Sequence, residues 1–157
     1  MRRSVYIETT IISYLAANPH TDIIRAAHQL LTWQWWNERK QLFDLFASEL
    51  VYQEASAGDA NVALRRLALL KNIPRLESSP IAEALAEQLV TQKALPQQAV
   101  ADAAHIAIAA AHNVDYLLTW NCRHLANISL QKRVWTVIQT AGLESPLICT
   151  PEQLMEK

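Results

Sequence analysis

Five short stretches of the chain are continuously apolar and rich in β-branched or aromatic residues, and each is bounded by turn residues or by residues that start a helix. Strands that are apolar on both sides are typical of a parallel sheet whose two faces are covered by helices. The predicted strands are residues 5–7, 42–47, 75–77, 115–119 and 147–149.

The segments between these strands are rich in alanine, leucine, glutamine and glutamate, a composition that favours helices. The predicted helices are residues 22–40, 49–57, 61–72, 81–93, 97–112 and about 130–140. Ser79 and Pro80 provide an N-cap and a first-turn proline for one of them. The sequence Thr150-Pro151-Glu152-Gln153 has the pattern of a capping box and predicts a short terminal helix.

Strands that alternate with helices predict right-handed crossovers and therefore an α/β fold, a three-layer α/β/α sandwich with a central parallel sheet of about five strands. A chain of 157 residues can bury one good core, so we expect a single domain over residues 1–157. In such folds a ligand binds beyond the carboxyl ends of the strands. Polar residues at those ends are therefore the candidates for function.

The composition excludes several classes of enzyme. Gly58 and Gly142 are the only glycines, so the chain has no glycine-rich phosphate loop, dinucleotide fingerprint or G-x-S-x-G nucleophile turn. Cys122 and His124 form a C-x-H pair, but no second pair completes a zinc site, and we expect reduced thiols. The formal net charge is −1, so an RNA partner must be attracted by local chemistry.

The sequence also predicts where the protein works. Only Val5, Tyr6 and Ile7 form an apolar run before Glu8, which is too short for a signal peptide. No segment approaches the roughly 18 apolar residues of a membrane span. We therefore expect a soluble, cytoplasmic protein with no membrane partner.

Two glutamates stand out near the ends of predicted strands. Glu8 directly follows the first strand, where it is either a site acid or an ordinary helix-capping acid. Glu54 lies on the helix that the chain enters from the second strand. Glu49 is a rival on the same helix, but it falls in the first turn, where the helix dipole alone favours an acid.

Two further polar residues follow the later elements. Asp102 lies near the start of the most uniformly apolar helix, and a carboxylate on a buried helix needs a partner. Asn121 follows the fourth strand and is either a weak metal ligand or a helix N-cap. Three converging carboxylates, Glu8, Glu54 and Asp102, suit Mg²⁺ or Mn²⁺, which polarise a phosphodiester and lower the pKa of an attacking water.

Four segments in this order resemble the acidic-site motifs of PIN domains, and the VapC branch of bacterial toxin–antitoxin systems most of all. The resemblance covers essentially the whole chain. The segments are Tyr6-Ile7-Glu8-Thr9-Thr10, residues 48–54, Asp102-Ala103-Ala104-His105-Ile106-Ala107 and Leu118-Thr119-Trp120-Asn121.

The resemblance implies a divalent-metal-dependent endoribonuclease that hydrolyses RNA as the toxin of a toxin–antitoxin pair, forms a homodimer and is inhibited by a peptide of a cognate antitoxin. It implies catalytic roles for Glu8, Glu54, Asp102 and Asn121, with the three acids as metal ligands. Two residues depart from the family pattern. Glu8 stands where aspartate is usual, and Asn121 stands where many members have a fourth aspartate, so we expect one tightly bound ion.

Four neighbouring residues have two interpretations each. Thr9 either orients a metal ligand or water, or it simply starts the helix that follows. Thr119 has the same functional interpretation, and its alternative is the ordinary preference of threonine for strands. His105 lies one turn beyond Asp102, so it either bonds to that carboxylate or is a satisfied core histidine, which is the more common case. Arg123 contacts a phosphate or is simply an exposed cation.

Two other functions compete with the nuclease. One is a catalytically weak or inactive PIN-like module that binds a protein or nucleic-acid partner, in which Glu8 and Asn121 mark a decayed site. Weak stabilisation by Mn²⁺ would distinguish it from the nuclease. The other is a small phosphatase, which would need a nucleophilic aspartate after the first strand, and Glu8-Thr9-Thr10 matches that poorly.

Overall fold

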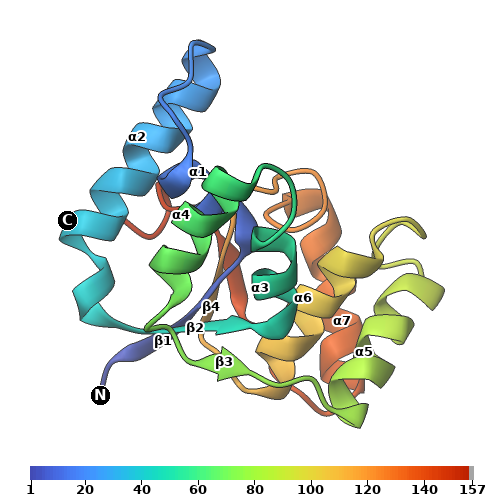
Figure 1. Cartoon of the computed structure of the whole chain (residues 1–157). Coiled ribbons are helices and arrows are strands. Elements are labelled where there is room, and N and C mark those ends of the chain that lie inside the picture. Colours follow the sequence, from blue (N-terminus) through green and yellow to red (C-terminus); the bar gives the residue numbers. More distant parts are fainter. Residues whose placement is uncertain (156–157) are drawn as a thin grey trace.

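Five parallel strands form the centre of the molecule. Their positions come from a computed structural model that describes residues 1–155. The strand order is β3-β2-β1-β4-β5, with every neighbouring pair parallel (Figure 1). The strands are β1 (Arg3–Ile7), β2 (Phe43–Ser48), β3 (Arg75–Leu76), β4 (Tyr116–Leu118) and β5 (Leu147–Cys149). All five predicted strands are confirmed: the bounds of β5 are as predicted, and those of the other four differ by at most two residues.

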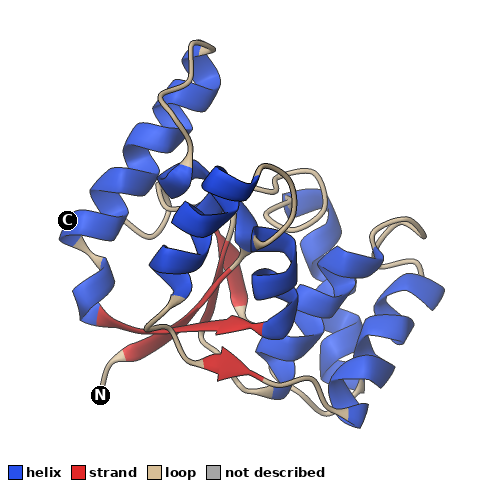
Figure 2. Cartoon of the chain, in the orientation of Figure 1, coloured by secondary structure: helices blue, strands red, loops and turns tan. Residues whose placement is uncertain are grey.

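Seven α-helices surround this sheet, as the colouring of Figure 2 shows. They are α1 (Thr9–Ala16), α2 (Ile23–Glu38), α3 (Glu49–Ala55), α4 (Ala60–Leu70), α5 (Pro80–Thr91), α6 (Val100–Ala111) and α7 (Ile128–Thr140), and a 3-10 turn η1 (Lys40–Leu42) precedes β2. α1 packs against α2, α3 and α4, whereas α5 packs against α6 and α7. Right-handed crossovers place these two groups on opposite faces of the sheet.

Three helix predictions need correction. The helix α1 received no predicted range, although a helix was expected to follow Glu8. α6 begins at Val100 rather than at Gln97, because residues 97 and 98 form a turn and Ala99 is the N-cap of the helix. The hydrogen bonds of the terminal capping box are present between Thr150 and Gln153, but residues 151–154 form only a turn, and residues 156–157 lie outside the described part.

The innermost elements are β1, β4 and α6. Val5, Tyr6 and Ile7 of β1 are completely buried, as are Leu117 and Leu118 of β4. Nearly every residue of α6 from Ala103 to Ala110 is buried as well. Because these elements are rigid and close-packed, polar side chains at their ends are held in fixed positions.

The strand order reverses beside β1, at a topological switch point of the sheet. From β1 the chain proceeds to β2 on one side, and it returns to β4 on the other side of β1. This reversal is the point at which open α/β sheets bind ligands, beyond the carboxyl ends of the strands. Glu8 and Thr119 directly follow β1 and β4 and therefore lie at this switch point.

No helix within residues 1–155 has the length and apolar character needed to cross a membrane.

At the opposite edge of the sheet, Asp115 ties β4 to β1. Its Oδ2 accepts hydrogen bonds from the backbone N–H of Ser4 at 2.8 Å and from Ser4 Oγ at 3.0 Å. The backbone bond from Ser4 is the main reason that the pKa of this carboxyl is lowered, against the effect of partial burial. A lowered pKa in the folded state means that the ionised form stabilises the protein.

We therefore expect Asp115→Asn to lower the free energy of unfolding by about 1 kcal/mol at pH 7, after allowance for solvent screening at this half-exposed site. The stabilisation is complete above the ordinary aspartate pKa of about 3.9 and disappears as the pH falls through the lower folded-state pKa. Urea unfolding of both proteins between pH 7 and pH 2.5 measures this. Asp44→Asn, at an exposed position of β2, is the control, and parallel pH curves for Asp115→Asn and wild type would contradict the prediction.

Candidate metal centre

Glu8 is a buried carboxylate at the start of α1, with 5% of its surface exposed. It is the N-cap of this helix, and its Oε2 accepts the backbone N–H of Thr10 at 3.2 Å. Its Oε1 accepts hydrogen bonds from the hydroxyls of Thr10 and Thr119, both at 2.6 Å. Buried charge is costly unless hydrogen bonds compensate it, and these three donors hold the Glu8 carboxylate in one position. Thr119 thus contacts a candidate metal ligand.

Glu54 lies on α3, whose start is fixed by the N-cap Ser48. Its Oε1 accepts hydrogen bonds from Thr9 Oγ1 at 2.6 Å and from His105 Nε2 at 2.7 Å. Partial burial raises the pKa of Glu54, but the hydrogen bonds from His105 and Thr9 outweigh this and lower the pKa overall. Its Oε2 has no hydrogen-bond partner among residues 1–155, so it is available to a ligand.

His105 belongs to a buried chain of hydrogen bonds that ends on Glu54. Ser48 Oγ lies 2.7 Å from the hydroxyl of Tyr6, and this hydroxyl lies 2.6 Å from His105 Nδ1. Burial raises the pKa of Tyr6 strongly, so its hydroxyl keeps its proton. One arrangement satisfies every atom: Ser48 donates to Tyr6, Tyr6 donates to Nδ1, and the Nε2–H donates to Glu54. We call this set the Tyr6–His105 chain.

Glu8, Glu54 and His105 form a group whose potential ligand atoms all lie within 4.8 Å of one another. Two carboxylates at this separation match the donors that Mg²⁺ and Mn²⁺ prefer. Both ring nitrogens of His105 already have hydrogen-bond partners, so we assign this residue to orienting Glu54 rather than to binding the ion directly. The residues present therefore fit a hard divalent cation held by Glu8 and Glu54.

The structure places Asp102 beside this group rather than within it. Its Oδ1 accepts a hydrogen bond from Asn121 Nδ2 at 3.0 Å, and its Oδ2 lies 2.9 Å from His124 Nδ1. The backbone N–H of Asn121 donates to Thr119 Oγ1 at 2.9 Å, and Thr119 in turn bonds to Glu8. Asp102 is thus linked to the first carboxylate through two intermediate residues.

Three other expectations can be compared with this geometry. His105 is 1% exposed and hydrogen-bonded at both nitrogens, but it bonds to Glu54 and not to Asp102. Asn121 Oδ1 accepts the backbone N–H of His124, as an N-cap would, although a turn rather than a helix follows. Arg123 is exposed, and its side chain forms no ion pair within residues 1–155.

Glu49, the rival on α3, has a purely structural partner. Its Oε2 lies 2.9 Å from Arg75 Nη1, and both side chains are more than half exposed. It lies in the first turn of α3, as the helix-dipole argument required.

The fold is similar to that of a chain in the crystal structure of VapBC2 from Rickettsia felis bound to a DNA fragment from their promoter. The TM-score is 0.56 at 14% sequence identity, and the similarity covers 94% of this chain and 98% of that chain. The two chains share one fold. No protein-family model and no curated protein matches the sequence.

The similarity to VapBC2 confirms the α/β fold that the resemblance to PIN domains implied. Four residues that contact the site residues were not predicted from the sequence: Tyr6, Thr10, Ser48 and His124. Tyr6 carried a signal, because a phenol in a fully apolar strand must find a hydrogen-bond partner when buried. The role of His124 could not be foreseen, because its contact with Asp102 depends on how the turn after β4 meets α6.

Proposed function

We propose that the protein is a divalent-metal-dependent endoribonuclease that hydrolyses RNA phosphodiesters. The observation that carries this proposal is the group formed by Glu8, Glu54 and His105 at the carboxyl edge of a parallel sheet, where two carboxylates can share one cation. The shared fold with VapBC2 and the order of the four PIN-like motifs support the same activity. The chain has no phosphate loop that would favour another phosphoryl chemistry.

In this proposal Glu8 and Glu54 hold Mg²⁺ or Mn²⁺, and Asp102 completes the site through a direct or a water-mediated contact. The ion would polarise the scissile phosphate and lower the pKa of the attacking water. The protein contributes the fixed positions: the hydroxyls of Thr10 and Thr119 hold Glu8, whereas His105 and Thr9 hold Glu54. Asn121 is a neutral neighbour, which favours one ion over two.

The biological role that fits these features is that of the toxin in a toxin–antitoxin pair. We propose that the chain forms a homodimer, acts on RNA in the cytoplasm and is inhibited by a cognate antitoxin. The support is the name of the structural neighbour, VapBC2, together with the VapC-like motifs.

One observation favours the second candidate, a partner-binding module without activity. Both oxygens of Asp102 are occupied by Asn121 and His124, and Oε1 of Glu8 already accepts two hydroxyls. A site closed by its own hydrogen bonds would bind an ion weakly. The two candidates differ in whether millimolar Mn²⁺ raises the melting temperature.

The decisive experiment incubates purified protein, free of any antitoxin, with structured and unstructured RNA in Mn²⁺, Mg²⁺ or EDTA. We expect cleavage with either metal, none in EDTA, and at least a tenfold lower rate for Asp102→Asn, because this residue contributes to the site from its margin. The Asp102→Asn protein also reveals contaminating nucleases, whose activity it would leave unchanged. No cleavage of any RNA, together with no Mn²⁺ binding by calorimetry, would favour the partner-binding module.

A further inference from the structure

A hollow of about 430 Å³ lies beside the candidate metal centre, between α1, the start of α2 and α4. Thr10 forms part of its wall, and the same Thr10 hydroxyl donates to Glu8 at 2.6 Å. The hollow therefore opens next to the carboxylate that we assign to the metal. The lining residues are Thr10, Ser13, Tyr14, Ala17, His20, Arg25, Val62 and Arg66.

The charge of this hollow is opposite to that of the neighbouring centre. Arg25 and Arg66 line it, no carboxylate does, and neither guanidinium forms an ion pair within the described part of the chain. The nearest acids in sequence, Asp22 and Asp59, cap the N-termini of α2 and α4 through backbone N–H groups. A protein with a net charge of −1 thus presents, beside its acidic site, two guanidinium groups that have no carboxylate partner among residues 1–155.

Arg66 is oriented in a way that leaves donors for a ligand. Its Nη1 donates to the carbonyls of Ala55 and Ala57, both at 3.1 Å, and this fixes the turn between α3 and α4. Its Nε is buried and has no hydrogen-bond partner in the structure as described. Planar guanidinium groups bind phosphate well, and Arg66 Nη2, which has no hydrogen-bond partner among residues 1–155 and is not a buried atom, remains available to donate to an anion in the hollow.

Aromatic rings form the other side of the hollow. Tyr14 packs edge-on against His20, His28 and Trp120, with ring centroids 5.6, 6.1 and 6.3 Å away. His28 stacks on Trp120 at 4.0 Å, and Trp120 Nε1 donates to Thr32, so the rings support one another. A rigid aromatic ring beside cationic groups is the arrangement that binds an unpaired base together with its phosphate.

From these observations we infer that the hollow binds one unpaired nucleotide of the RNA next to the scissile phosphodiester. Tyr14 and His20 contact the base, and Arg25 and Arg66 contact the phosphate. The volume of the hollow is in the lower part of the range of about 300–1,000 Å³ that is usual for small-molecule pockets, and this size suits one nucleotide. A base held in a duplex cannot enter it, so the RNA binds here through a single-stranded segment. This inference rests on the proposed nuclease function.

The test uses a fluorescein-labelled, single-stranded RNA of mixed sequence and measures its binding by anisotropy. All proteins carry Glu54→Gln, which is expected to slow cleavage by about 100- to 1,000-fold and removes one negative charge next to the RNA. We expect Arg25→Glu to weaken binding about tenfold and to reduce the dependence of log Kd on log salt concentration by about one unit. Tyr14→Ala should weaken binding at least fivefold. Tyr14→Phe should bind as tightly as the protein with Tyr14, because stacking needs only the ring.

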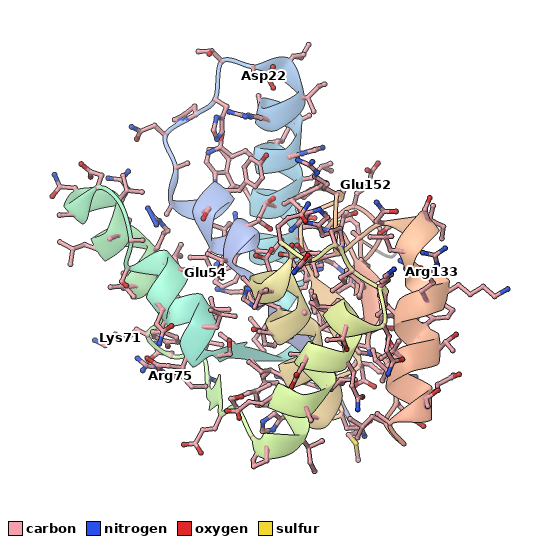
Figure 3. The ribbon with its side chains drawn as sticks, turned by 90° about the vertical axis from the view of Figure 1, so that its right-hand side faces the viewer. Asp22, Glu54, Lys71, Arg75, Arg133 and Glu152 are labelled. Carbon is pink, nitrogen blue, oxygen red and sulfur yellow. The ribbon has the colours of Figure 1, made fainter. Side chains whose placement is uncertain are left out.

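Lys71→Glu is the matched control for Arg25→Glu, because it also reverses one exposed positive charge. Lys71 follows the C-terminal end of α4 and does not line the hollow. In the view of Figure 3 its label lies below that of Glu54, near the C-terminal end of α4. A blunt RNA duplex should bind more weakly than the single strand. If Arg25→Glu and Lys71→Glu have equal effects while the wild-type enzyme still cleaves RNA, the nucleotide site is overturned and the nuclease stands. The hollow would then be left for an acidic segment of a protein partner. If the wild type neither cleaves nor binds RNA, both proposals fail.

Discussion

Replacing Glu54 with glutamine is expected to abolish Mn²⁺ binding and to lower the rate of RNA cleavage by about 100- to 1,000-fold. The Oε2 of Glu54 is the carboxylate oxygen of this site that has no hydrogen-bond partner within residues 1–155, so it is the atom best placed to bind an ion. Glutamine keeps the size of the side chain and can still accept from Thr9, but it removes the charge. Isothermal titration with Mn²⁺ and single-turnover cleavage measure the two effects.

Glu49→Gln is the control for this prediction, since it changes the same residue type on the same helix. Glu49 pairs with Arg75 at the surface, where an ion pair contributes at most about 1 kcal/mol, so cleavage and Mn²⁺ binding should remain as in the wild type. Equal loss in both variants would mean that overall charge, rather than a site at Glu54, governs activity. Full activity of Glu54→Gln would remove Glu54 from the metal site.

The contrast between these two glutamates was predictable from the sequence because it depends on local position. Glu49 lies in the first turn, where the helix dipole explains an acid, and Glu54 lies five residues later, where it does not. The five strands were predictable for a similar reason, since continuous apolar runs are typical of strands buried on both faces. The ends of helices were less predictable from the sequence. Thr150 and Gln153 form the hydrogen bonds of a capping box, but only a turn follows Thr150.

The arrangement of the acids could not be obtained in the same way. Asp102 and His105 are one turn apart, so a bond between them was geometrically possible. In the structure, Glu54 from α3 meets His105, and Asn121 and His124 from the turn after β4 meet Asp102. These contacts join elements that are distant in the sequence. Their identity depends on how α6 packs between α3 and that turn, which no local pattern specifies.

The net charge of the chain is a poor predictor of whether it binds RNA. A value of −1 indicates no attraction for RNA, yet it averages an acidic centre with the two arginines of the neighbouring hollow. The field that a substrate encounters is local, because charges further apart than about 8–10 Å are largely screened at physiological salt. Charge reversal at Arg25 is therefore a sharper probe of RNA binding than any measure of the whole chain.

Interrupting the Tyr6–His105 chain is expected to weaken Mn²⁺ binding even where no proposed metal ligand is altered. His105→Ala removes the donor to Glu54 and leaves the buried Tyr6 hydroxyl with one partner fewer, so Mn²⁺ affinity should fall by about 10- to 100-fold. Tyr6→Phe acts one step further away. It leaves His105 Nδ1 without its partner and should lower the affinity by about tenfold. Calorimetry with Mn²⁺ measures both variants.

Loss of packing alone would not explain the pH dependence expected of these two variants. The hydrogen bond from His105 helps to lower the pKa of Glu54, so weakening that bond raises this pKa. Glu54 must be ionised to bind the ion, and the pH at which Mn²⁺ begins to bind should therefore move upward in His105→Ala and Tyr6→Phe.

Tyr52→Phe is the matched control, because the Tyr52 hydroxyl is also buried but bonds to the carbonyl of Leu70. It should lower the free energy of unfolding by about 1–3 kcal/mol without moving the onset of Mn²⁺ binding. The same upward shift in Tyr52→Phe would show that general loosening, and not the Tyr6–His105 chain, controls Glu54.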